Sequence, residues 1–156
     1  MKASHILATL SFMLTAMTIL QAADDTVTNA LVGHWHGGAR IVVDWCKQQR
    51  LPVAIEIHSD GSVTGKIGDA TLKNGRLSRN RGWIGRKLNL ATDYIITGGL
   101  TGSIIAIEGI TRSSVSVPLD FTSNTLVGGV HTSGSKFGGK KDGILSAASL
   151  KLIHME

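Results

Sequence analysis

The chain contains a single cysteine, Cys46, in 156 residues. An intramolecular disulfide needs two cysteines, so the fold must be stabilised by packing alone. Proline is also scarce, with Pro52 and Pro118 the only two, and no proline-rich linker divides the chain. Aromatic residues make up only 4 % of the sequence. This is few for an outer-membrane β-barrel, which carries aromatic girdles, although the alternation typical of such strands keeps that alternative open.

No apolar run is long enough for a membrane-spanning helix. The apolar run near the start, Ile6–Leu20, is about 15 residues long, whereas a spanning helix needs about 20. It follows the basic Lys2 and ends at Gln21-Ala22-Ala23, an order that is typical of a secretory signal peptide rather than an uncleaved anchor. We therefore predict a signal peptide over residues 1–22 and a single domain over residues 23–156, exported to the periplasm or secreted.

Acidic residues are fewer than basic ones, 11 against 16, which gives a formal net charge of +5. The cations gather in the acid-free stretch 73–87 and in the Gly-rich stretch 133–141. Such clusters predict a surface for an anionic partner, and charged hairpin loops that only keep the protein soluble are the alternative. Because the chain is predicted to be exported, nucleic acid is not an expected partner. The predicted patch comprises Lys73, Arg76, Arg79, Arg81, Arg86, Lys87, Lys136, Lys140 and Lys141.

Apolar and polar residues alternate along most of the chain, which predicts β-strands. The dipeptides Asp60-Gly61, Asn74-Gly75 and Asp142-Gly143 predict tight turns, because Asp, Asn and Gly tolerate a positive φ. We expect an all-β antiparallel meander of roughly eight to ten strands, closed as a barrel, with a sandwich as the alternative. The expected strands, some of which would fuse, are 31–36, 39–46, 52–58, 62–67, 70–73, 83–90, 93–97, 103–109, 111–119, 125–131 and 144–153.

Gly33-His34-Trp35 resembles the Gly-x-Trp motif that opens the first strand of the calycin barrels, meaning lipocalins, fatty-acid-binding proteins and avidins. Asp60-Gly61-Ser62-Val63-Thr64-Gly65 is similar to the Asp-Gly turn and Thr-Gly step of the avidin branch. The resemblance implies a barrel with Trp35 at its closed end. Two features depart from it: the tryptophans of a biotin pocket are missing, and the last strand offers Lys151 where lipocalins place an arginine against the opening tryptophan.

The leading functional hypothesis is a non-enzymatic binding protein, without a cofactor, that holds a small apolar or amphipathic ligand inside the barrel. Such pockets are apolar with a few polar anchors. The predicted ligand-binding residues are Trp35, Trp45, Trp83 and Glu108. Glu108 either points inward as an anchor or ends a strand in solvent. The alternative function is a surface-interaction protein that meets an anionic macromolecule or membrane surface with the basic patch.

A third hypothesis is an enzyme with a metal site. His34 and His36 share one strand face, and His58 or Glu56 from a neighbouring strand would complete a set of zinc ligands. Histidines that simply face solvent are the alternative. Cys46 is interpreted as a small buried apolar residue.

The predicted strand 103–109 contains Ile104-Ile105-Ala106-Ile107, which is apolar on both faces. Such a strand needs two dry surfaces. Neighbouring strands of the same chain would supply them, or a second copy would, and we therefore expect this strand as a candidate homo-oligomer contact.

Overall fold

The alternating segments of the sequence form antiparallel strands. The computed structural model describes residues 29–80, 92–134 and 145–155. These residues form a short 3-10 helix and ten strands. In chain order the elements are η1 (Asn29–Leu31), β1 (Gly33–Ile41), β2 (Arg50–Ile57), β3 (Ser62–Ile67), β4 (Ala70–Arg79), β5 (Tyr94–Thr101), β6 (Ser103–Ile105), β7 (Ile110–Thr111), β8 (Ser114–Thr122), β9 (Thr125–Ser133) and β10 (Leu145–Met155).

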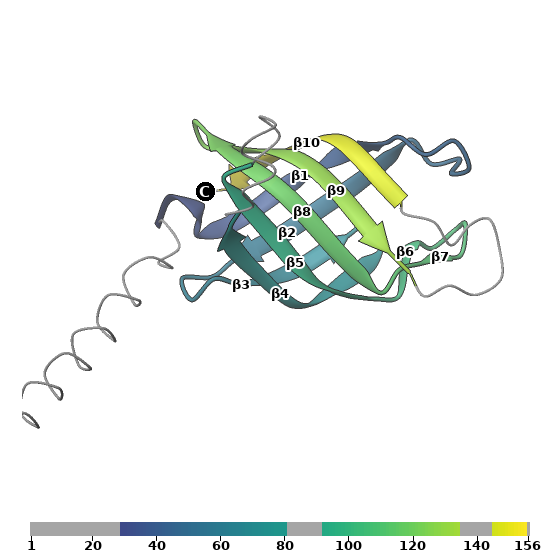
Figure 1. Ribbon diagram of the computed structural model, residues 1–156, viewed down its shortest axis with the longest axis horizontal. Helices are drawn as coiled ribbons and strands as arrows, with labels where there is room; N and C mark the ends of the chain where they lie inside the picture. Colours follow the sequence, from purple (N-terminus) through teal and green to yellow (C-terminus); the bar gives the residue numbers. More distant parts are fainter. Residues whose placement is uncertain (1–28, 81–91, 135–144, 156) are drawn as a thin grey trace, which may run out of the picture.

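Eight of the strands close into one barrel in the order β1-β10-β9-β8-β5-β4-β3-β2 (Figure 1). Every neighbouring pair is antiparallel, and the first strand pairs with the last. The predicted all-β, closed antiparallel meander is therefore confirmed. Closure leaves the barrel without a free sheet edge, which distinguishes it from an open sandwich.

Aliphatic side chains fill the barrel. Inward residues on every strand are buried, as in Leu51 (0 % exposed), Ile57 (1 %), Ile96 (1 %) and Leu119 (0 %), and they form one core. A side chain that lined a water-filled hollow would be accessible to water, so these exposures mean that side chains occupy the interior. Eight strands enclose a space just wide enough for this or for one small ligand.

Trp35 closes the end of the barrel next to η1. Its side chain is 1 % exposed, and its Nε1 donates a hydrogen bond of 2.9 Å to the carbonyl of Leu31. The indole packs edge-on against Phe121 and His154, with ring centroids 6.2 and 4.8 Å away. The last strand therefore places His154 against the opening tryptophan, while Lys151 faces outward and is exposed.

The β6–β7 hairpin closes the opposite end (Figure 1). Ile104 and Ile105 are 0 % and 1 % exposed and belong to the core. Asp69 holds the hairpin at two points: its N–H donates to the Ile104 carbonyl (3.0 Å), and its carboxylate accepts the N–H of Ala106 (2.9 Å). The barrel of the same chain thus buries Ile104 and Ile105, whereas Ala106 and Ile107 are exposed, Ile107 at 97 %.

Several predicted element boundaries are wrong. The predicted strands 31–36 and 39–46 form one strand that ends at Ile41, and the alternation that continues through Val43 and Trp45 lies in a loop. Both side chains are half-buried and pack against the core from this loop. Their alternation therefore reflects how they cover the end of the barrel and does not indicate a strand. The predicted strand 103–109 ends at Ile105.

The Asp60-Gly61 turn joins β2 to β3 as predicted, with Gly61 at φ 78°. Asn74-Gly75, in contrast, does not form a turn. It lies inside β4, where the registers with β3 and β5 both shift and Asn74 has φ 50°. The positive φ that was read as a hairpin signal produces a β-bulge here. The predicted turn at Asp142-Gly143 and the predicted strand 83–90 lie outside the described residues.

Among the residues that the structure describes, no helix has the length and apolar character needed to cross a membrane.

Candidate functional site

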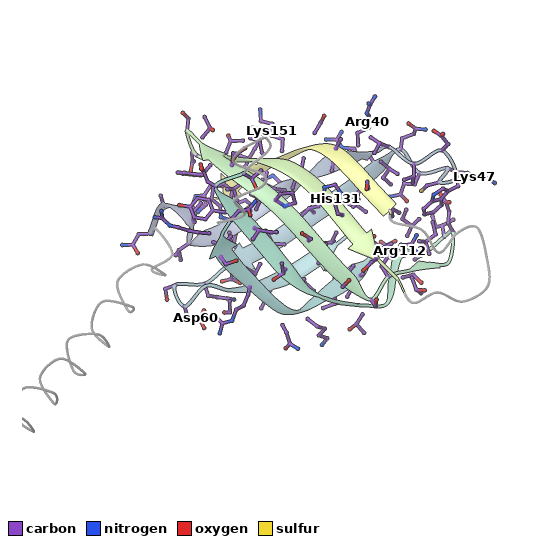
Figure 2. All side chains as sticks on the ribbon, viewed as in Figure 1. Arg40, Lys47, Asp60, Arg112, His131 and Lys151 are labelled. Carbon is purple, nitrogen blue, oxygen red and sulfur yellow. The ribbon has the colours of Figure 1, made fainter. Side chains whose placement is uncertain are left out.

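Of the residues predicted to bind a ligand, the described ones lie at opposite ends of the barrel, Trp35 at one end and Trp45 and Glu108 at the other. Trp35 lies in the core near η1. Trp45 lies in the β1–β2 loop, half-buried, with the Arg112 guanidinium 5.3 Å from the centre of its ring. Figure 2 places Arg112 at the end of the barrel that carries β6 and β7. Trp83 lies outside the described residues.

Glu108 lies in the turn between β6 and β7. Its carboxylate accepts the N–H of Gln48 at 2.8 Å and the N–H of Lys47 at 3.3 Å. It therefore ties the tip of the hairpin to the β1–β2 loop. This contact gives Glu108 a structural role. The sequence had suggested either an inward-pointing ligand anchor or a strand end in solvent, and neither describes this contact.

Cys46 is buried beside this contact, at 6 % exposure, as the sequence analysis predicted. Its Sγ lies 3.5 Å from the Gln48 carbonyl and 3.8 Å from the Glu108 carboxylate. Burial raises the pKa of the thiol, and the nearby Glu108 charge raises it further. The hydrogen bond with the Gln48 backbone lowers the pKa, but the net shift is upward. A protonated, buried thiol is a poor nucleophile, so the cysteine does not point to covalent chemistry.

The histidines of the predicted metal site lie on the outer surface of the barrel. Glu56 stands between His34 and His58, with 3.7 Å from its Oε1 to His34 Nε2 and 3.7 Å to His58 Nδ1. His36 pairs with Ala54 and Ile153 instead. Within the described ranges, no group of three or more His, Cys, Asp or Glu side chains is arranged to hold a metal ion.

Part of the predicted basic patch lies on β4. Lys73, Arg76 and Arg79 are all exposed. The bulge at Asn74 keeps Lys73 and Arg76 on the outward side although they are three residues apart, whereas Arg79, two residues after the buried Leu77, falls on the other side at the end of the strand. Lys66 on β3 is exposed next to Thr71 of β4. We call Lys66, Lys73 and Arg76 the β4 basic face. The other predicted members, Arg81, Arg86, Lys87, Lys136, Lys140 and Lys141, lie outside the described residues.

The carboxylates around this face make local contacts rather than ion pairs with it. Asp60 accepts both the N–H and the hydroxyl of Ser62, at 2.8 and 2.6 Å, and these bonds lower its pKa. Asp69 holds the β6–β7 hairpin, and Glu56 lies between two histidines. In the part of the chain that the structure describes, no carboxylate lies within 4.0 Å of a β4 cation.

The sequence analysis missed one further feature on the outer surface. Arg40 and Arg50 lie directly opposite each other on β1 and β2. They line a depression of about 350 Å³ together with Gly38, Ala39, Gln49 and Ser149. Figure 2 shows Arg40 on the outside of the barrel, toward the end opposite Asp60. Correct boundaries for β1 and β2 would have placed the two arginines together.

Comparison of the chain with protein-family models, with curated proteins and with solved structures finds no match. The closed barrel of eight antiparallel strands is consistent with the calycin resemblance, and no family is assigned.

Proposed function

We propose that this protein is an exported, non-enzymatic binding protein that meets an anionic partner with the outer surface of its barrel. The observation that carries the proposal is the β4 basic face. Its cations are exposed and lie on the outward side of two paired strands, and none of them forms an ion pair with a carboxylate among the described residues. Cations gathered on one face attract anions and speed their association, although the charge of Arg76 also acts on the nearby Asp60 carboxylate.

The hydrogen bonds of the nearby carboxylates support the same proposal. Asp60, Asp69 and Glu108 each accept hydrogen bonds from backbone N–H groups, so their charges serve turns and the hairpin. A surface that had evolved only for solubility would mix both signs of charge along its strands. Here the cations of β4 stand beside neutral residues, Thr97 and Gly99 on β5 among them.

The filled interior argues against the alternative of a ligand inside the barrel. A closed β-barrel is a fold that can hold a ligand. In this barrel the inward positions carry large aliphatic residues such as Ile57, Ile67 and Leu126, each 1 % exposed. A ligand there would have to displace packed side chains, which costs free energy.

The predicted signal peptide supports export and a partner outside the cytoplasm. Anionic partners in such compartments include phospholipid headgroups and acidic polysaccharides. Both present repeated negative charges. A face with several cations can contact such charges at several points, whereas a single deep pocket cannot.

The test is binding to two polyanions, phosphatidylglycerol vesicles and heparin, with phosphatidylcholine vesicles as the neutral control. We expect binding to at least one polyanion, and about tenfold weaker binding after a fourfold increase in salt, because salt screens exposed charges. The double variant Lys73→Gln, Arg76→Gln should lose most of the affinity.

The matched control is the double variant Lys47→Gln, Lys151→Gln, which removes the same charge from exposed positions away from β4. It should bind nearly as well as the unmodified protein. No binding to either polyanion at low salt, or equal losses in the two double variants, would contradict the proposal.

A further inference from the structure

The Arg40–Arg50 pair is an unusual arrangement on a barrel surface. The two residues are opposite each other on antiparallel strands, so their side chains leave the same face of the sheet. Both are exposed. Like charges in directly opposite positions destabilise a strand pair. The arrangement therefore calls for a negative charge between or beside the guanidinium groups.

The described part of the chain does not supply that charge. Over residues 29–80, 92–134 and 145–155, no carboxylate lies within 4.0 Å of either guanidinium group. Asp44 lines a neighbouring depression of about 370 Å³ together with Arg40, but it does not approach to ion-pair distance. An anion bound beside the two guanidinium groups would offset the part of their repulsion that water and salt do not screen.

Gly38 brings the second arginine toward β1. A Cβ built on Gly38 would lie 3.3 Å from Nε and 3.8 Å from Cγ of Arg50. The Arg50 side chain therefore lies across the backbone of β1 instead of extending freely into solvent. This places it over the floor of the depression of about 350 Å³ that Arg40 also lines.

Ser149 adds a hydroxyl to the same depression. It lies in an irregular part of β10, where the register with β9 shifts between Ala147 and Leu150, and its φ is 53°. A non-glycine residue with such a φ carries backbone strain, which is often retained at binding sites. The Ser149 hydroxyl is exposed and has no hydrogen-bond partner within the described residues.

We propose that this depression is an oxyanion site that takes one phosphate- or sulfate-type group between Arg40 and Arg50. Guanidinium groups bind such anions through paired N–H donors, and two of them suit a tetrahedral group with two negative charges. Ser149 and Gln49 also line the depression, and their side chains carry further hydrogen-bond donors. The site is separate from the β4 basic face and does not depend on it.

The test is a titration of the protein with inorganic phosphate, and separately with sulfate, followed by amide resonances in NMR spectra. We expect saturable shifts at residues 38–40, 49–50 and 148–150. Arg40→Gln and Arg50→Gln should each weaken phosphate binding by about tenfold or more, because each removes a charged donor. In the absence of phosphate, each variant should have a higher Tm than the unmodified protein, because the repulsion is gone.

The control is Lys47→Gln, which removes one charge from the neighbouring loop without removing a donor from the depression. It should bind phosphate as the unmodified protein does. Shifts that are absent at these residues, or a loss in Lys47→Gln equal to that in Arg40→Gln, would overturn the proposal. The opposite effects of the arginine substitutions on Tm and on phosphate binding separate a binding site from a merely structural pair.

A parallel titration with glycerol phosphate identifies the source of the anion. Binding as tight as that of inorganic phosphate indicates an esterified group such as a lipid headgroup, and much weaker binding indicates the free ion. Either result supports the oxyanion site. The site also stands if the protein fails to bind the polyanions through β4, so the two proposals fail independently.

Discussion

Asp60 and Glu108 show how single carboxylates organise this barrel. Each accepts hydrogen bonds from backbone N–H groups close to a turn, Asp60 after β2 and Glu108 between β6 and β7. These contacts need a negative charge at one defined point and use it locally. Because the carboxylates are used in this way, the cations on the outward faces of the strands have no ion-pair partner among the described residues. The functional proposals start from these cations.

The Asp60–Ser62 contact predicts a local pH response. The Ser62 hydroxyl and N–H lower the pKa of Asp60 below its ordinary value of 3.8. Because the folded protein favours the ionised form, the contact stabilises the fold above about pH 4 and this contribution is lost as the pH falls through the lowered pKa. In Ser62→Ala the main cause of the shift is gone, and an NMR titration should show the pKa of Asp60 closer to its ordinary value. An unchanged pKa would mean that the hydroxyl does not hold the carboxylate.

The Glu108 contact predicts a difference between two substitutions. Glu108→Ala removes the acceptor for the Gln48 N–H and should lower the free energy of unfolding by about 1 kcal/mol. Glu108→Gln keeps an oxygen acceptor and should cost less. The most specific readout is hydrogen exchange at the Gln48 amide, which should become faster in Glu108→Ala. Unchanged exchange there would show that the contact does not protect the loop.

At the scale of elements, irregularities in the strands decide which side chains reach the surface. The bulge in β4 resets the alternation between Lys73 and Arg76, so that both remain outside while Leu72 and Leu77 remain inside. Glycines have a related role where strands approach each other closely. A Cβ on Gly128 of β9 would lie 1.9 Å from the carbonyl oxygen of Pro118 on β8.

Gly128→Ala should therefore lower the free energy of unfolding by about 3 kcal/mol or more, since a backbone carbonyl cannot move aside without disturbing the strand pair. Gly99→Ala is the matched control on β5. Its Cβ would meet its nearest atom at 3.6 Å, an ordinary contact, and the substitution should be nearly neutral. Urea denaturation of both variants measures the difference. Similar midpoints would mean that β9 can move away from β8 without loss.

The sequence predicts the elements better than their connections. Alternation and the Asp60-Gly61 turn were enough for the fold class, because a closed antiparallel barrel follows from many short two-faced strands. The same rule failed at Val43 and Trp45, which alternate while covering the barrel end from a loop. The turn signal was wrong at Asn74-Gly75, because residues that tolerate a positive φ are found in β-bulges as well as in turns.

The candidate sites divide in the same way. Lys73 and Arg76 of the β4 basic face were in the patch predicted from the sequence, because they are near each other in the chain, whereas Lys66 joins them only through the pairing of β3 with β4. The Arg40–Arg50 pair could not, because strand pairing across a misjudged loop brings the two residues together. Glu108 was noticed for its charge, but its partners come from the distant β1–β2 loop.

At the scale of the whole molecule, the barrel is a filled scaffold with a charged exterior. The core from Trp35 at the η1 end to Ile104 and Ile105 at the hairpin end is continuous, which is why we propose a binding function on the outside. The described exterior offers two cationic regions, the β4 basic face and the depression between Arg40 and Arg50. We propose that both bind anions, and neither proposal requires the barrel to open.

The most direct test of this account is NMR mapping of the protein with a short heparin oligosaccharide. We predict that resonance shifts concentrate at outward positions of β3 and β4, around Lys66, Lys73 and Arg76, and that the methyl groups of Ile57, Ile67 and Leu126 do not move. Shifts confined to those inward methyl groups, or a co-purified apolar ligand in contact with them, would contradict the account and restore the hypothesis of a pocket inside the barrel.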